Sequence, residues 1–370
     1  MAPPMHRGTP NLYRAFAERW SALQEQDGSF YLGPALAATK RAPLWRPQRG
    51  LVVGDEGIQV IRNQCLHGMK YIINPTSNNL PQPLESPLTC SWHHASYSHS
   101  GVLERCGAMP IQPSDLKVNV CPKFEFHEWQ GIVFELGRNT NKAKERLEIT
   151  LAFLEEKLGK WLRFKERVLL LSTVSCQEAD FLTTLFNYLD CRHVRRGHAE
   201  TLARMLDTEK YFSVVGPDGT IIQWMGFKES WFETPLGRYY QEMNWPRPEY
   251  GAIWVTLPDG MMIEIYFDQS VVVSQGFADP KDWRKCVLYH DFYYPMGTPV
   301  TFAELHRADV FDPTGQEDEG PCSQTTANLD RAIDEGLGDE PVGFFEPIQE
   351  DRSPLFLQQV ARRLHYPLTE

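Results

Sequence analysis

Apolar residues recur along parts of this chain at every third or fourth position, which is the spacing of one face of a helix. Residues 12–26 show this pattern most clearly, and residues 177–194 repeat it. Residues 139–164 combine the same period with many charged side chains, which indicates a long amphipathic helix. A last apolar face over residues 353–366 predicts a helix close to the C-terminus.

Other stretches follow the shorter period of strands. Residues 51–64, 131–136 and 167–174 are apolar and rich in β-branched residues, which predicts strands. Residues 211–227 and 251–277 each contain an Asp-Gly pair between two apolar runs, which is typical of a β-hairpin. Because these helices and strands do not alternate as βαβ units, we expect an α+β fold with an antiparallel sheet.

The patterns divide the chain into three parts. Residues 1–40 form a helical segment that we expect to pack on the C-terminal part, residues 41–145 form a small β domain, and residues 146–370 form the larger mixed domain. An acidic, Gly-containing stretch at residues 312–343 is interpreted as an irregular surface segment.

Composition and charge narrow the classes of function. With 42% hydrophobic and 12% aromatic residues, the chain has ample material for a packed core. Its net charge of −11 is concentrated in residues 301–370, where fifteen acids face five Lys and Arg, and no basic stripe favours nucleic-acid binding. No run of ~20 apolar residues predicts a membrane span. The eight cysteines are scattered and no export signal is visible, so we expect a cytoplasmic protein without a disulfide framework.

Two short motifs offer soft and imidazole ligands to a metal. Cys65 and His67 form a Cys-x-His pair, and Cys90 and His93 form a Cys-x-x-His pair. Zinc could bind the four side chains as a tetrahedral structural site. A Rieske [2Fe–2S] cluster needs two cysteines on one iron and two histidines on the other, and each motif can supply one ligand to each iron. The spacing favours the Rieske cluster and leaves zinc as the alternative.

A second set of candidate ligands follows about a hundred residues later. His193 and His198 are five residues apart, so on a straight helix their rings would point roughly 140° apart, and a break at Gly197 could bring them together. Two imidazoles and one carboxylate with open positions form the facial triad of non-haem Fe(II) oxygenases. Asp190 lies one helical turn before His193, where its carboxylate could orient that ring. The alternative is an ordinary charged helix end.

Together the two motifs resemble the large subunit of the Rieske non-haem iron oxygenases. Ser91-Trp92 and the YSHSG sequence at residues 97–101 are similar to parts of the family's cluster motif. Leu66, Gly68 and His94 depart from its usual proline, arginine and glycine. The resemblance implies that residues 41–145 are a Rieske domain, inserted ahead of a catalytic domain with a helix-grip-like antiparallel sheet.

The resemblance also implies a third iron ligand near the C-terminus. Asp351 lies in EDRSPLFLQQ at residues 350–359, which looks like the ending of the demethylase-type members. Asp318, in the acidic stretch, is the second candidate. We expect Asp351, with His193 and His198, to bind a mononuclear Fe(II).

In the family a head-to-tail trimer pairs the cluster of one subunit with the iron of the next. By resemblance, Asp190 would then link His93 of one subunit to His193 of its neighbour. Electrons would come from an NAD(P)H-dependent reductase, with or without a ferredoxin. The expected reaction is hydroxylation or oxidative demethylation of a small organic substrate. Cis-dihydroxylation of an arene and a zinc-stabilised, non-enzymatic binding protein are the alternatives.

Overall fold

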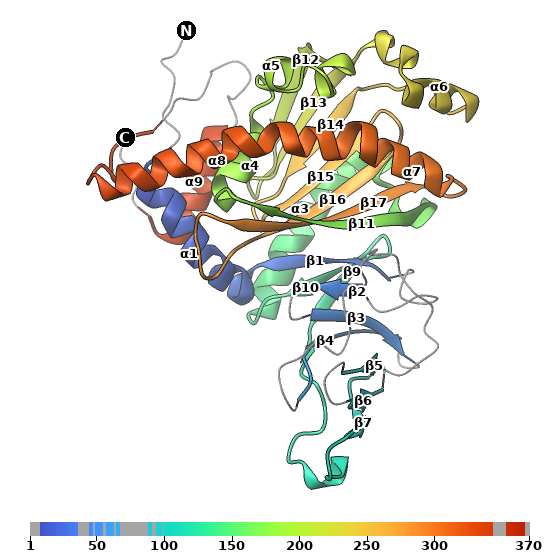
Figure 1. Ribbon diagram of the computed structural model, residues 1–370, viewed down its shortest axis with the longest axis vertical. Coiled ribbons are helices and arrows are strands. Elements are labelled where there is room, and N and C mark those ends of the chain that lie inside the picture. The colour runs from blue at the N-terminus through green and yellow to red at the C-terminus, as the bar shows by residue number, and fades with distance from the viewer. Residues whose placement is uncertain are drawn as a thin grey trace. The chain divides into compact units, whose positions relative to one another are not determined.

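The chain divides into two compact units that are described separately. The structure is a computed structural model, and it describes residues 8–35, 44–46, 49–54, 57–62, 64–66, 88–90, 94–98, 100–342 and 353–366. Residues 1–26 and 145–370 belong to the larger unit, and residues 27–144 belong to the smaller one (Figure 1). Within the described part of the chain, no helix is long and apolar enough to cross a membrane.

A seven-stranded antiparallel sheet forms the centre of the larger unit. Its strands, in spatial order, are β11 (Arg167–Gln177), β17 (Cys286–Pro295), β16 (Val271–Ala278), β15 (Met261–Tyr266), β14 (Ala252–Thr256), β13 (Ile221–Phe227) and β12 (Leu206–Val215). In β14 and β15 every residue is buried, because both faces of the sheet are covered. The α+β class with an antiparallel sheet is confirmed.

Local turn chemistry accounts for the two predicted hairpins. Strands β12 and β13 turn around Asp218 and Gly219, whose φ is +94°. Strands β14 and β15 turn around Asp259 and Gly260, whose φ is +74°. Glycine adopts these positive φ values without the steric cost that a Cβ would impose. Both chain reversals therefore occur at the Asp-Gly pairs that predicted them.

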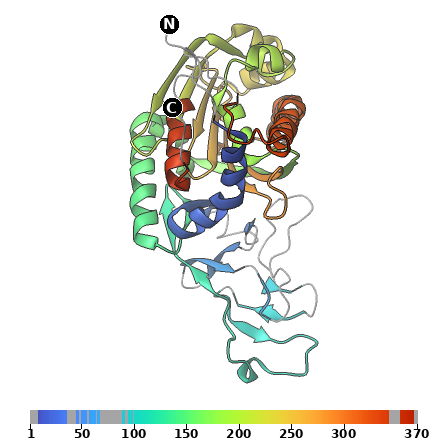
Figure 2. The same cartoon turned by 90° about the vertical axis from the view of Figure 1, so that its left-hand side faces the viewer.

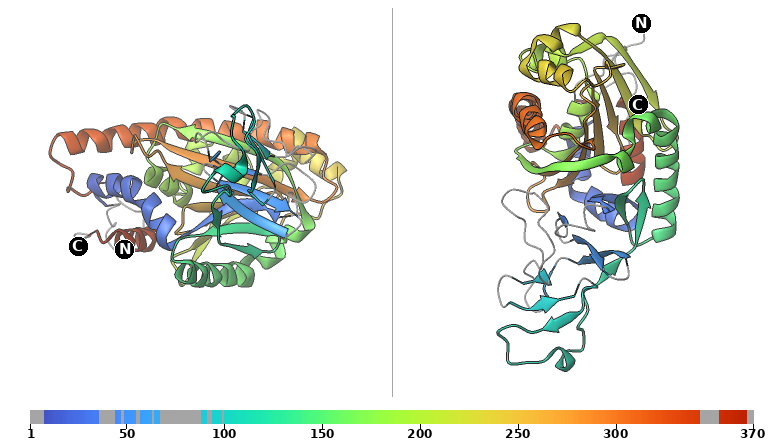
Figure 3. Two further views of the ribbon diagram at one scale, coloured as in Figure 1. Left: turned by 90° about the horizontal axis from the view of Figure 1, so that it is seen from below. Right: turned by 90° about the vertical axis from the view of Figure 1, so that its right-hand side faces the viewer.

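Helices cover both faces of this sheet, as Figures 2 and 3 show for α8 on one side and α3 on the other. The described helices are α1 (Pro10–Asp27), α3 (Thr140–Leu162), α4 (Phe181–Leu189), α5 (Val194–Gly197), α6 (Pro235–Glu242), α7 (Val300–His306), α8 (Asp312–Asp334) and α9 (Ser353–Leu364). A π-helical segment, Arg307–Phe311, joins α7 to α8. Single 3-10 turns lie at Pro113–Asp115, Phe164–Glu166, Leu202–Arg204 and Glu229–Glu233.

Helix α8 corrects one prediction. The sequence predicts an irregular segment at residues 312–343, but residues 312–334 form a helix that lies across the sheet (Figure 1). Glycines and the internal Pro321 make this sequence a poor helix former by itself. Cys322, Thr326 and Leu329 are nevertheless buried, so tertiary packing stabilises the helix.

The predicted N-terminal helix, α1, packs within the larger unit. Phe16 stacks on Trp20 at 4.6 Å between ring centroids and contacts Phe181 of α4 at 5.6 Å. Phe356 of α9 contacts Phe186 of α4 in the same hydrophobic cluster. Three helices that are far apart in the sequence thus share one core, which fixes the position of α4.

The described residues of the smaller unit form three antiparallel sheets. They are formed by β1 (Ser29–Pro34), β10 (Ile132–Leu136) and β9 (Phe126–Trp129); by β2 (Leu44–Arg46), β3 (Arg49–Gly54), β4 (Gly57–Arg62) and β8 (Lys123–Phe124); and by β5 (Leu88–Thr89), β6 (Ser96–Tyr97) and β7 (Leu103–Arg105). This unit begins at Asp27, whereas the sequence suggested a boundary near residue 41.

Candidate metal centres

The two histidines of the second motif lie in a turn after helix α4. The helix ends at Leu189, and the short helix α5 ends at Gly197, as the sequence suggested. His198 then leaves the helical conformation, with φ −112° and ψ 40°. This break brings Nε2 of His193 to 3.0 Å from Nε2 of His198.

Asp318 of α8 joins the two imidazoles. Its Oδ1 lies 3.0 Å from Nε2 of His198 and 3.5 Å from Nε2 of His193. Three donors bound to one metal at about 2.1 Å, at right angles to one another, lie about 3.0 Å apart. The separations therefore fit a two-histidine, one-carboxylate face around a metal ion. Among the described residues, this is the group of three whose donor atoms lie within 4.8 Å of one another.

Glu317, the neighbour of Asp318, fixes the second imidazole from its other side. Its Oε2 lies 2.8 Å from Nδ1 of His198 and also accepts a hydrogen bond from Thr201 Oγ1 at 2.6 Å. A carboxylate at Nδ1 keeps the proton on that nitrogen and leaves Nε2 with a lone pair for a metal. The sequence pattern did not identify Glu317, because its role depends on where α8 packs.

The two imidazoles differ in their electrostatics. Burial disfavours the charged ring and lowers the pKa of His193, although the carboxylates of Asp318 and Asp190 act in the opposite direction. Burial also acts against the charged form of His198, but hydrogen bonds to Asp318 and Glu317 outweigh it, so its pKa is raised. The acids next to the rings thus compensate in part for their removal from water.

Asp190 directly follows helix α4 and lies in the turn that leads to His193. The sequence placed it on the same helical face as His193, but α4 ends at Leu189 and Asp190 has non-helical φ and ψ angles of −96° and 90°. Its Oδ1 accepts a hydrogen bond from the backbone N–H of Arg192 at 3.0 Å, which holds the turn leading to His193. The predicted link between subunits remains a prediction.

The third ligand expected from sequence, Asp351, lies outside the described residues. Within the described part of the chain, Asp318, the second candidate, is the aspartate whose carboxylate reaches both imidazoles. The geometry therefore makes Asp318 a candidate third ligand, and Asp351 remains a prediction. The sequence ranked Asp318 lower because the surrounding stretch has the composition of a solvated loop.

A buried carboxylate ties the two ligand-bearing segments together. Asp180 caps the N-terminus of α4 by accepting hydrogen bonds from the backbone N–H and Oγ1 of Thr183. Its Oδ2 also accepts a hydrogen bond at 2.9 Å from Thr326 Oγ1 of α8, and its own N–H donates to the same hydroxyl. Because α4 leads to the histidines and α8 contains Asp318, Asp180 helps to set the distance between them.

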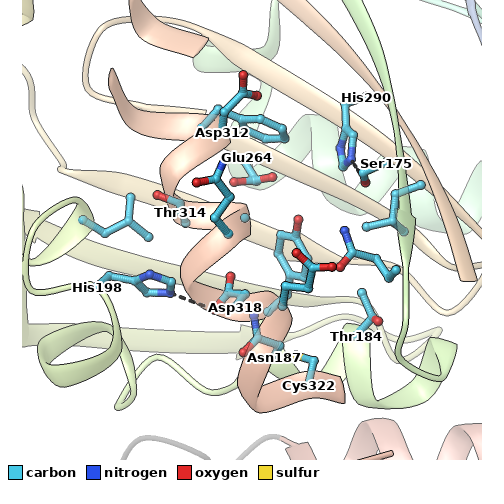
Figure 4. Close-up of a pocket in the computed structure, with 18 of the residues that line it drawn as sticks. Ser175, Thr184, Asn187, His198, Glu264, His290, Asp312, Thr314, Asp318 and Cys322 are labelled. Carbon is cyan, nitrogen blue, oxygen red and sulfur yellow. Dashed lines mark hydrogen bonds and ion pairs between the residues drawn. The ribbon is translucent and has the colours of Figure 1, made fainter. Parts of the chain in front are cut away.

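His193, His198 and Asp318 line a cavity of about 340 Å³. Figure 4 shows His198 and Asp318 in its wall. Its walls come from the sheet, from α4 and from the first half of α8. Aromatic rings of Tyr188, Trp254, Tyr266 and Phe311 line it. A cavity of this size and apolar character suits a small organic molecule held next to the metal site.

His290 also lines the cavity but is fully engaged elsewhere. Its Nε2 lies 2.9 Å from Ser175 Oγ, and its Nδ1 lies 2.7 Å from Ser274 Oγ. A ring with both nitrogens hydrogen-bonded is a structural element of the sheet, so we do not assign it as a ligand.

The cysteines of the first motif are buried in the smaller unit. Cys65 is 3% exposed and Cys90 is 1% exposed, and both belong to one hydrophobic cluster. Their histidine partners, His67 and His93, lie outside the described residues. Two buried thiols in one cluster fit the cysteine half of a Rieske centre.

The tyrosine that begins the YSHSG sequence contacts one of these thiols. The hydroxyl of Tyr97 donates to Cys65 Sγ at 3.0 Å and accepts from the backbone N–H of Leu66 at 3.0 Å. Burial, followed by this hydrogen bond to Cys65, raises the pKa of Tyr97. Tyr97 therefore remains a neutral hydrogen-bond donor to the sulfur.

Comparison with known proteins identifies the fold. No family model matches the chain. Its structure superposes on that of a quaternary ammonium Rieske monooxygenase with a TM-score of 0.70, covering 96% of this chain and 95% of the other at 13% identity. It also matches naphthalene 1,2-dioxygenase from Rhodococcus sp., with a TM-score of 0.65, coverage of 95% and 93%, and 11% identity. The chain has the fold of a Rieske oxygenase alpha subunit.

A curated sequence relative agrees with this Rieske oxygenase fold. The putrescine 2-hydroxylase of Ralstonia nicotianae is 23% identical over 282 residues, which cover 73% of this chain and 70% of that protein. The resemblance inferred from the cysteine and histidine motifs is thus confirmed at the level of the fold. His94, which stands where the Rieske motif usually has glycine, takes a left-handed φ of 56°.

Proposed function

We propose that the chain is the oxygenase component of a Rieske-type enzyme system. In this proposal, it uses dioxygen and electrons from an NAD(P)H-dependent reductase, with or without a ferredoxin, to hydroxylate or oxidatively demethylate a small organic substrate. The observation that carries the proposal is the convergence of His193, His198 and Asp318 at the edge of the 340 Å³ cavity. These three side chains would hold a mononuclear Fe(II).

The chemistry of the iron site follows from its neighbours. Ferrous iron, when bound, would supply the activation of dioxygen for insertion of one oxygen atom into the substrate. Glu317 would keep His198 oriented through Nδ1, as it does in the structure. The aromatic walls of the cavity would exclude bulk water and hold the substrate beside the three ligands.

Electrons would enter through the smaller unit. Cys65 and Cys90, with His67 and His93, would hold a Rieske [2Fe–2S] cluster. We propose a homotrimer in which this cluster serves the iron of the adjacent subunit and Asp190 links the two centres. Support comes from the fold and from one neighbour, whose solved structure is described in terms of inter-subunit electron transfer.

Monooxygenation is the favoured outcome over cis-dihydroxylation. The curated relative is a hydroxylase, and a further structural neighbour, dicamba monooxygenase, matches with a TM-score of 0.53 and 11% identity. Naphthalene 1,2-dioxygenase has the same fold, so the fold by itself favours neither outcome. Counting the labelled oxygen atoms in the product would separate the two reactions.

Metal and sulfide analysis tests the proposal directly. Anaerobically purified protein should contain acid-labile sulfide, iron in excess of a [2Fe–2S] cluster and the EPR signal of a reduced Rieske centre. His193→Ala should lose the mononuclear iron and keep the cluster, and Cys65→Ser should do the opposite. A colourless protein with zinc and no sulfide, even after reconstitution, would show that it is a zinc-stabilised binding protein instead.

A further inference from the structure

Among the described residues of the central sheet that line the cavity, Glu264 is the one carboxylate. Glu264 lies in the middle of β15, directly opposite Trp254 on β14 and Val272 on β16. It is 4% exposed, and every residue of its strand is buried. Figure 4 shows Glu264 in the same cavity as Asp318 and His198.

Only one of the two carboxylate oxygens of Glu264 has a hydrogen-bond partner among the described residues. The hydroxyl of Tyr266 donates to Oε2 of Glu264, whereas Oε1 is buried and has no hydrogen-bond partner in the described residues. Leaving a buried acceptor unpaired destabilises the folded protein, and more so when the group is charged. An unpaired buried group in a folded protein needs an explanation, and a partner that binds in the cavity is one.

The charges around the cavity indicate the sign of that ligand. Asp312, Asp318 and Glu319 line the cavity together with Glu264, and among its described lining residues none is Lys or Arg. An anionic substrate would therefore meet several negative side chains and no permanent positive charge. A cation would be attracted, both by the acids and by the faces of the aromatic rings.

The raised pKa of Glu264 is consistent with the lack of a positively charged side chain next to it among the described residues. Burial, opposed in part by the hydrogen bond from Tyr266 and reinforced by the charge of Asp318, raises the pKa of Glu264 to about 7. An ammonium group at Oε1 would favour the carboxylate form, because an opposite charge nearby stabilises the ionised acid.

We propose that the cavity binds an alkylammonium ion whose N–H group donates to Oε1 of Glu264. Tyr188, Trp254 and Tyr266 would surround the ammonium and the carbons next to it. The unpaired acceptor selects an ammonium with at least one N–H over a quaternary one. The alkyl chain would then extend toward His193, His198 and Asp318. The reaction of the bound ammonium ion rests on the proposed function. Binding of the ammonium ion to Glu264 does not require iron.

Binding measurements with a matched series of ligands test it. Calorimetric titration of the wild-type protein would compare butylammonium, butyltrimethylammonium, 1-butanol and butyrate at one pH and ionic strength. We expect butylammonium to bind most tightly and butyrate not to bind. Equal affinity for butylammonium and 1-butanol, or tighter binding of butyrate, would overturn the proposal without any variant being made.

A neutral variant of nearly the same shape tests whether Glu264 is the residue that binds the ammonium group. Glu264→Gln should weaken butylammonium binding roughly ten- to a hundredfold, the loss of one hydrogen bond to a charged group, and should change 1-butanol binding little. Glu249→Gln, at an exposed acid that pairs with Lys160, is the matched control and should bind as the wild type does. Unchanged butylammonium affinity in Glu264→Gln would remove Glu264 from the site.

The same titrations separate this proposal from the proposed function. They should be run on protein stripped of iron and on iron-loaded protein. Amine binding by the iron-free protein, together with a failure to bind mononuclear iron on reconstitution, would overturn the oxygenase and keep the ammonium site. Normal iron and sulfide contents, together with no preference for butylammonium, would overturn the ammonium site and keep the oxygenase.

Discussion

The two candidate metal regions differ in how far apart along the chain their ligands lie. Cys65 and Cys90 come from two short motifs whose spacing already suggests a cluster. His193 and His198 form a similar local pair, but the carboxylate beside them, Asp318, comes from a different helix far along the chain. A local motif can be recognised by counting residues, whereas a ligand brought in by packing cannot.

The two regions also differ in what supports the ligands. In the smaller unit, a neutral hydroxyl from Tyr97 contacts the thiol of Cys65. In the larger unit, carboxylates surround the imidazoles, and the buried Asp180 connects the helices that carry them. Variants that affect one region and leave the other unchanged are therefore the sharpest tests.

The largest effect is expected from removal of the third ligand. Asp318→Ala should lose the mononuclear iron, because two imidazoles alone hold Fe(II) weakly, while the [2Fe–2S] content stays constant. Asp351→Ala is the matched comparison and should keep both. Iron and acid-labile sulfide per chain measure the outcome. Loss of iron in Asp351→Ala with retention in Asp318→Ala would restore the assignment made from sequence.

A large effect on folding is expected at Asp180. Asp180→Ala removes the N-cap of α4 and the carboxylate that accepts from the Thr326 hydroxyl, which should lower the free energy of unfolding by about 3 kcal/mol. Urea denaturation gives the value. Asp282→Ala, at a partly exposed carboxylate that pairs with Arg284, should change it by about 0.5 kcal/mol or less. Equal losses in the two variants would show that Asp180 does not connect the helices.

A smaller effect is expected at the carboxylate behind His198. Glu317→Gln should weaken iron binding roughly tenfold, since the ring loses a charged partner at Nδ1 but keeps Asp318 at Nε2. Competition with a chelator measures the affinity. Glu335→Gln, at the exposed end of the same helix, provides the control. An unchanged affinity in Glu317→Gln would mean that Asp318 alone orients the ring.

The smallest effect is expected in the cysteine region. Tyr97→Phe removes the hydrogen bond to Cys65 Sγ, which should lower the reduction potential of the cluster, because the donor stabilises the more negative reduced state. The free energy of unfolding of Tyr97→Phe should be lower than that of the wild type by about 1 kcal/mol. A potentiometric titration monitored by EPR measures the first quantity. A higher potential in the variant would contradict this role for Tyr97.

Much of the fold was predictable because its signals are local. The apolar face of residues 12–26 and the Asp-Gly turn at residues 259 and 260 are short-range features, and the structure contains the expected helix and hairpin. The paired motifs indicated the Rieske fold, and the likeness to solved Rieske oxygenases confirms it. The helix predicted over residues 177–194 was too long, because α4 covers Phe181–Leu189 and Asp190 already has non-helical angles.

The carboxylates of the candidate site were harder to predict. Helix α8 contains glycines and Pro321, so its own propensity argues against a helix, and its burial against α4 decides otherwise. Glu264 did leave a signal, since it is a lone charge in a continuous apolar strand. The same pattern would also fit a strand with one face in solvent, where Glu264 would be exposed. Only the structure shows that both faces of the sheet are covered.

The sequence by itself determined the helices and hairpins, the paired cysteine and histidine motifs and the class of fold, because each depends on residues close together in the chain. Only the tertiary structure decided that Asp318 meets His193 and His198, and that Glu264 is buried beside them. Both facts depend on how one long helix packs against the sheet, and packing is the sum of many weak contacts between distant segments.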